Sequence, residues 1–308
     1  MARYLALILV VLPVSVLSQA AMPADYQAVL TTLSKQGDFK DNVLRVNIPR
    51  NDLHVVVDGV ATPTPFGFGG WLAVTKGTSG MEVMMGDLVL TENEVNPVMS
   101  ALVTNGLDVT ALHNHFFFDT PRIYYMHVHG HGSAADLAAK IKPALGLIGI
   151  NSTADRRGGT PGPAANGREI TGTLDSAALA RIVGYQGEQN GAVYKITIGR
   201  PDIAVKDMGA AINARMGLNT WAAFYGNNAD AVVAGDVAML DYEVTPVLKA
   251  LRANGLDVVA IHHHMTGTDP PVFFLHYWGK GSAQRLATAF RAALDRTGAR
   301  TRTTATHP

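Results

Sequence analysis

Histidines carry the clearest chemical signal in this sequence. Of the eleven histidines, nine fall in two short windows, and three positions recur in both. The recurring positions are His113, His115 and His127 in the first window and His262, His264 and His276 in the second. Because residues i and i+2 of a strand point to the same face, each His-x-His pair is predicted to present two imidazoles side by side.

These six histidines are the predicted metal ligands. Three protein ligands plus one open coordination position are typical of a catalytic zinc or another first-row ion. Cysteine is absent, so imidazole and oxygen would hold the ion, and we expect a divalent metal with zinc as the first candidate. The alternative is that the histidines only hydrogen-bond backbone carbonyls. A short hairpin loop would also pair His127 nearer to Thr110 than to His113.

Two glutamates recur beside the histidines and are the predicted catalytic residues. Glu94 and Glu243 each stand at the start of a predicted helix that precedes a His-x-His strand, where a carboxylate could act as a general base or metal ligand. Glu94 has an alternative role in a capping box, but the matching cap position of the second copy is Leu240, which has no side-chain oxygen. Asp87 and Asp236 also recur, and a turn before the helix is an equally good interpretation of them.

The elements that position these residues are duplicated. Residues 86–134 align without gaps on 235–283, and nearly half of the aligned pairs are identical. Upstream, 43–53 matches 193–203. Each copy is predicted to be α+β, with an opening helix, alternating strand patterns and a β-α-β-β-α order at its end. We expect two tandem copies of one mixed α/β unit, related by a pseudo-two-fold axis and packed closely.

The chain divides into five predicted segments. An apolar run followed by small residues predicts a secretory signal peptide over 1–20. The others are a first repeat domain (21–150), a Gly/Pro-rich linker (151–170), a second repeat domain (171–300) and a polar tail (301–308). The apolar run is shorter than the roughly 20 residues that span a bilayer. We therefore expect an exported protein, periplasmic or secreted, without an integral membrane segment or the cysteine that a lipid anchor requires.

Charge and composition restrict the expected partners. Lys plus Arg and Asp plus Glu are 25 each, so the net charge is zero, and the sequence lacks the basic stripe that nucleic-acid binding requires. With 47% hydrophobic residues the chain can build a core. A small molecule or a polysaccharide is the expected ligand, and the oligomeric state is left open.

The two histidine windows read ALHNHFFFDTPRIYYMHVHGHG and AIHHHMTGTDPPVFFLHYWGKG, each preceded by E-V-x-P-V and N-G-L-D-V. They resemble the LppY/LpqO-like family, exported bacterial proteins of unknown function. The resemblance covers essentially the whole mature chain and implies an envelope or secreted protein. The first window departs from the pattern, with His129 and His131 where the second has Trp278 and Lys280. A double cupin has a similar metal motif, but a cupin half is nearly all strand, whereas here a helix precedes each His-x-His.

Two functional hypotheses follow from these observations. The first is an exported metal-dependent enzyme of hydrolase or lyase type that acts on a small molecule or an envelope component. The alternative is a non-catalytic envelope protein that binds a metal or another ligand. A structural protein whose histidines are core residues is a third possibility, and stoichiometric metal in the purified protein would exclude it.

Overall fold

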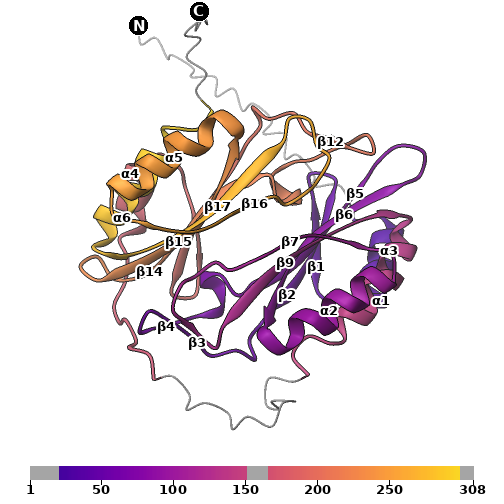
Figure 1. Ribbon diagram of the computed structural model, residues 1–308, viewed down its shortest axis with the longest axis horizontal. Coiled ribbons are helices and arrows are strands. Elements are labelled where there is room, and N and C mark those ends of the chain that lie inside the picture. The colour runs from indigo at the N-terminus through magenta and orange to yellow at the C-terminus, as the bar shows by residue number, and fades with distance from the viewer. Residues whose placement is uncertain (1–20, 151–165, 299–308) are drawn as a thin grey trace, which may run out of the picture.

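Two six-stranded sheets face each other at the centre of the molecule, and helices cover the outer face of each sheet (Figure 1). The computed structural model describes residues 21–150 and 166–298. In the first copy the elements are α1 (Ala24–Leu33), β1 (Gly37–Lys40), β2 (Val43–Pro49), β3 (Val55–Val57), β4 (Val60–Thr62), a 3-10 turn (Thr64–Phe66), β5 (Gly69–Lys76), β6 (Glu82–Thr91), α2 (Glu92–Thr104), β7 (Asp108–His113), β8 (Asp119–Thr120), β9 (Ile123–Gly132) and α3 (Ala134–Leu145).

The second copy repeats this series. Its elements are α4 (Ser176–Val183), β10 (Glu188–Asn190), β11 (Val193–Gly199), β12 (Lys206–Asp207), β13 (Ala210–Ala211), a 3-10 turn (Ala214–Met216), β14 (Asn219–Gly226), β15 (Ala231–Leu240), α5 (Asp241–Ala253), β16 (Asp257–His262), β17 (Val272–Gly281) and α6 (Ala283–Leu294).

Strand order is the same in both large sheets. The first runs β1-β2-β5-β6-β9-β7 and the second β10-β11-β14-β15-β17-β16, with neighbouring strands antiparallel. The mixed α and β content predicted from the sequence is confirmed. The double-cupin alternative is wrong, because each sheet packs one whole face against helices.

Alternation along the strands separates an outer apolar face from an inner mixed face. On the outer face of the first sheet, Leu72, Leu88 and Met126 pack with Leu102 of α2 and Leu137 of α3. The residues between them point to the second copy. Part of that inner face is apolar: one cluster brings Phe66 and Phe116 against Trp278, and another joins Met85 to Phe274. These mixed clusters hold the two copies together.

The helices that carry Glu94 and Glu243 begin where the sequence predicts. α2 follows Thr91 and ends before Asn105-Gly106, where Gly106 has a φ of +73° that ends the helix at low cost. α5 has the same arrangement. Within the described ranges, no helix combines the length and the apolarity that a membrane crossing requires.

The predicted linker is too long at its C-terminal end. Arg168 forms a parallel bridge with Val60, and Ile170 is buried in a cluster shared by both copies. Residues 166–170 therefore belong to the packed structure. The predicted signal peptide, residues 151–165 and the polar tail lie outside the described residues.

Candidate metal centre

A row of side chains crosses the inner face of each sheet. In the first sheet Trp71 on β5, Asp87 on β6 and His127 on β9 are direct cross-strand neighbours. The matching row of the second sheet consists of Trp221, Asp236 and His276. Because directly opposed residues of antiparallel strands share a face, each row points toward the other copy.

Six histidines meet where these rows face each other. They are His113, His115, His127, His262, His264 and His276, all buried. The Nε2 atoms of His113 and His276, which come from different copies, are 3.1 Å apart. The rings of His113 and His262 are stacked, with centroids 3.7 Å apart. Histidines that the sequence assigned to two separate copies thus form one centre.

Each His-x-His pair stays together although its second member lies beyond the strand. β7 ends at His113 and β16 ends at His262. The ring centroids of His113 and His115 are nevertheless 5.1 Å apart, and those of His262 and His264 are 5.3 Å apart. The prediction that each pair presents its imidazoles on one side is confirmed.

The third histidine of each copy reaches the pair through an irregularity in the hairpin. The register shifts between Val109 and Ala111, so His127 pairs with Ala111 instead of Thr110. The rings of His113 and His127 then stack with centroids 5.1 Å apart. The expected obstacle to a three-histidine arrangement is absent from the first copy as described. In the second copy the centroids of His262 and His276 are 4.9 Å apart.

Backbone carbonyls orient three of the rings. In each, Nδ1 lies 3.2 Å from a carbonyl oxygen: His127 with Gly86, His276 with Gly235, and His262 with His263. A ring that donates its Nδ1 hydrogen in this way keeps a lone pair on Nε2, which is the usual arrangement of metal-binding histidines. The orientation of these three rings therefore suits metal ligation.

Several buried ring nitrogens have no hydrogen-bond partner among the described residues. They are His113 Nδ1, both nitrogens of His115, His127 Nε2, His262 Nε2 and His264 Nδ1. An unpaired buried polar group costs about 1–3 kcal/mol, so a bound ion or polar ligand could offset a considerable cost here.

The donor atoms are close enough to share an ion. Three groups have their donor atoms within 4.8 Å of one another: His113, His127 and His262; His113, His115 and His276; and Asp236, His262 and His276. Around a tetrahedral zinc with bonds of about 2.1 Å, ligand nitrogens would be about 3.4 Å apart, close to the His113–His276 distance.

Burial favours neutral imidazoles at this centre. Desolvation lowers the pKa of His262 to about 4 and the pKa of His264 to about 3, with the neighbouring His264 also lowering the pKa of His262. Burial, and then nearby histidines, lower the pKa of His113, His115, His127 and His276 well below the usual value. Neutral imidazole is the form that binds metals.

A cavity of about 760 Å³ opens onto the centre. His115, His264 and His276 form part of its wall, together with Asp87 and Asp236. Burial raises the pKa of Asp87 to about 8, helped by the charge of Asp236, and burial raises the pKa of Asp236 to about 7. A ligand in this cavity would meet both carboxyl groups beside the imidazoles.

Two cations lie over indole rings on the cavity wall. The Arg45 guanidinium carbon is 3.7 Å from the ring centroid of Trp71, and Lys195 Nζ is 4.1 Å from that of Trp221. Burial lowers the pKa of Lys195 to about 8, with a further contribution from Arg45. The sequence reasoning missed these residues, although both pairs recur at an offset of 150, which was the available signal.

Glu94 and Glu243, the predicted catalytic residues, are not among the described residues that line the cavity. The Arg50 guanidinium donates to Glu94 at 2.7 and 3.1 Å, and Arg200 donates to Glu243 at 3.0 Å through two nitrogens. Both glutamates are buried at helix starts, away from the expected site.

Backbone groups use the remaining capacity of these carboxylates. Glu94 accepts hydrogen bonds from the N–H groups of Thr91 and Gly149, and Glu243 accepts them from Leu240 and Gly298. The glutamate itself caps the backbone, so Leu240 needs no side-chain oxygen. These contacts account for both glutamates without a catalytic role.

The turn predicted at Asp87 and Asp236 is wrong. Both aspartates lie within ten-residue strands, β6 and β15, which run on to the helix starts. Their glycine neighbours, Gly86 and Gly235, are strand residues that suggested a turn because glycine is depleted in strands.

Comparison with known proteins identifies the family. The sequence profile of the family described as Domain of Unknown Function (DUF1259) matches twice, over residues 27–147 and 177–296. The chain belongs to this family. The DUF1259 match covers both copies, and the resemblance to the LppY/LpqO-like family stays a prediction. No curated protein matches the chain.

Some solved structures align over much of the chain but superpose poorly. The trimeric bacterial microcompartment shell protein PduB is 13% identical, with 83% of this chain and 89% of that chain covered and a TM-score of 0.19. EtuB from Clostridium kluyveri is 10% identical, with 85% and 90% covered and a TM-score of 0.20. Likeness of this degree carries no argument about the fold or function of this DUF1259 protein.

Proposed function

We propose that this protein is an exported metal-dependent enzyme of hydrolase or lyase type, with its metal held between the two copies. The observation that carries the proposal is the convergence of six buried histidines, several with unpaired ring nitrogens, on one centre where three of them line a cavity. A pseudo-two-fold relation between the copies is part of the proposal, because matching residues of both supply ligands. Export rests on the N-terminal sequence alone.

The ligands are divided between the copies. His127 and His262 are the strongest candidates, since backbone carbonyls hold their Nδ1 atoms and leave Nε2 for the ion, and their donor atoms lie within 4.8 Å of each other and of His113. His276 joins them through its contact with His113. A divalent ion in this setting supplies Lewis-acid chemistry and activates water. His115 and His264 also line the cavity, so the centre is open to a small molecule.

The cavity favours a small polar substrate that carries an anionic group. Arg45 and Lys195 provide positive charge on its wall, and their indole partners restrict where that charge can move. Asp87 and Asp236 lie beside the histidines, where a carboxyl group can move a proton to or from a bound molecule. In this proposal the aspartates take the acid–base role that the sequence assigned to Glu94 and Glu243.

Elemental analysis of the purified protein tests the proposal. The native chain should contain stoichiometric divalent metal, and H262A/H264A should lose at least nine-tenths of the metal held at this centre. The matched control is H263A, which alters the residue between the two ligands. The His263 ring lies against Phe273, and its Nδ1 contacts the Val272 carbonyl. Equal metal in H263A and H262A/H264A would contradict the proposal.

The non-catalytic alternative predicts a different coordination state. An enzyme keeps an exchangeable water on its metal, whereas a storage site or structural site is closed by protein ligands. Water-proton relaxation measured with Mn²⁺ in the centre should therefore be enhanced over the free ion if the site is open. A bound ion without exchangeable water would favour the non-catalytic function.

A further inference from the structure

Two further histidines of β9 lie outside the six-histidine centre. His129 and His131 follow His127 at alternate positions and so share its face. Both contact Asp207, the last residue of β12 in the second copy. His129 Nε2 lies 2.6 Å from one Asp207 oxygen, and His131 Nε2 lies 2.9 Å from the other. The donor atoms of the three residues lie within 4.8 Å of one another.

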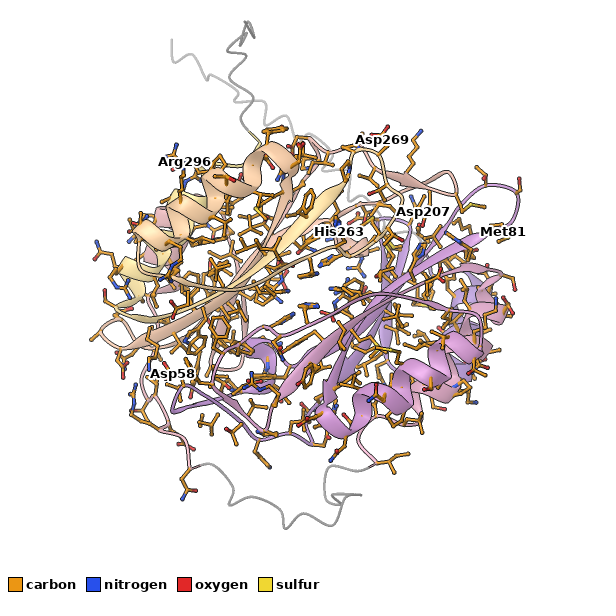
Figure 2. All side chains as sticks on the ribbon, viewed as in Figure 1. Asp58, Met81, Asp207, His263, Asp269 and Arg296 are labelled. Carbon is orange, nitrogen blue, oxygen red and sulfur yellow. The ribbon has the colours of Figure 1, made fainter. Side chains whose placement is uncertain are left out.

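The corresponding contact at the other end of the interface is an ordinary ion pair. Lys280, which matches His131 in the repeat, has its Nζ 2.5 Å from Asp58 Oδ2. Figure 2 shows Asp58 and Asp207 at opposite ends of the region where the two copies meet. A single lysine thus suffices to fasten a loop of one copy to the last strand of the other. The two imidazoles on Asp207 are therefore more than a contact between the copies requires.

We propose that His129, His131 and Asp207 form a second divalent-metal site that links the two copies. Two imidazole nitrogens and one carboxylate oxygen are a ligand set that zinc, nickel and copper accept. With metal–ligand bonds of about 2.0–2.2 Å, the donor atoms would be about 3–3.5 Å apart. The observed separations of 2.6–3.1 Å require only small side-chain movements.

The burial of the three residues suits a bound ion with open positions. The His129 side chain is 9% exposed, which limits competition from water, whereas that of His131 is 31% exposed. The three ligands leave room in the coordination sphere for water. Because the ligands come from both copies, binding stabilises the folded arrangement over the unfolded chain. The inference does not depend on the proposed function.

Zinc binding by the full chain tests the second site. In the H262A/H264A background, dialysis against Zn²⁺ followed by elemental analysis should leave one equivalent bound. Adding D207N should weaken that binding at least tenfold, because asparagine keeps the shape and one acceptor but loses the charge. D207N in the otherwise native chain should also lose one equivalent of zinc. This second measurement tests the site even if H262A/H264A folds poorly.

Two controls separate a metal site from a structural contact. D58N removes the corresponding ion pair and should leave the zinc content unchanged. H129W/H131K introduces the residues that the second copy carries at these positions, and it should lose the same equivalent as D207N. Full zinc content in D207N and H129W/H131K would show that the cluster only hydrogen-bonds. Because H262A/H264A should keep this equivalent of zinc, the result for the second site is independent of the result for the six-histidine centre.

Discussion

At the level of single residues, buried charge explains why Glu94 and Glu243 recur. Arg50 is 2% exposed and Glu94 is 1% exposed, so the buried glutamate needs the guanidinium, which Asp52 also holds. The sequence predicted that the two glutamates have a role, because both copies carry a glutamate at this position. It could not identify their role, because Arg50 lies 44 positions before Glu94 and their contact depends on the tertiary fold. Repetition identifies a constrained position, whereas the reason for the constraint lies in the fold.

Removing either glutamate should destabilise the protein strongly. E243A removes the buried one of the two carboxylates that hold Arg200 and leaves only the more exposed Asp202, so the expected loss in the free energy of unfolding is about 3–5 kcal/mol. E94A should behave alike at Arg50. Urea unfolding followed by circular dichroism measures the loss, and the metal content of the folded fraction should be unchanged. A variant E243Q with native stability but no activity would favour the catalytic role instead.

At the level of the elements, alternation along the strands decides which predictions succeed. The strand and helix patterns predicted the opening helix and the β-α-β-β-α order at the end of each copy. The pattern also predicted that each His-x-His pair would stay together. His127 does pair nearer to Thr110 than to His113, but the irregularity that puts it opposite Ala111, on the face of His113, leaves no mark in the apolar pattern. The turns predicted at the Gly-Asp pairs were wrong because close strand packing, and not a turn, requires glycine at these positions.

Close packing requires the strand glycine that precedes each aspartate. A Cβ at Gly235 would collide with the backbone oxygen of Trp221 and the hydroxyl of Tyr277. At Gly86 it would meet the Trp71 carbonyl oxygen at 2.8 Å. Each glycine carbonyl also orients a ligand, since His276 Nδ1 lies 3.2 Å from the Gly235 oxygen. One residue therefore sets both the strand spacing and the direction of an imidazole.

G235A should damage stability and metal binding together. The backbone oxygen cannot move away as a side chain can, so the strands must separate, at a cost of about 1–3 kcal/mol. The displaced carbonyl should weaken Zn²⁺ binding about 10- to 100-fold, the usual effect of losing a partner that orients a ligand. Thermal unfolding and calorimetric titration measure the two effects. The control is G69A, where a Cβ meets nothing within 4 Å and both quantities should stay native.

At the level of the whole molecule, the joining of two half-sites was beyond the reach of the sequence. Each copy offers three histidines at predictable positions, and the natural expectation is one site per copy. The two sets of histidines meet because the inner faces of both sheets face each other, as the stacking of His113 on His262 shows. No local pattern specifies which face of a sheet meets a second domain. Duplication therefore predicts the ligands but not the shared centre.

The shared centre should make the metal-free protein sensitive to acid. Each of the six histidines has a folded pKa below its unfolded value of about 6.5. Below that pH the unfolded chain binds protons that the native chain excludes, so stability is present above about pH 6.5 and is lost as the pH falls. Asp87 and Asp236 oppose this, because their raised pKa values make the native chain bind two extra protons over the same range.

Because six histidines outnumber the two aspartates, the unfolded chain binds more protons than the native chain below about pH 6.5, so the free energy of unfolding should fall as the pH falls. The metal-free chain, prepared with a chelator, should therefore lose stability toward acid in a titration followed by tryptophan fluorescence. In H262A/H264A the loss of stability with falling pH should be shallower, since two of the six groups are gone. Saturating Zn²⁺ should move the midpoint to lower pH, because the ion binds only the native, neutral imidazoles. Stability that stays level from pH 7 to pH 4.5 in the metal-free chain would mean that the histidines accept protons in the folded state, which would contradict their desolvation.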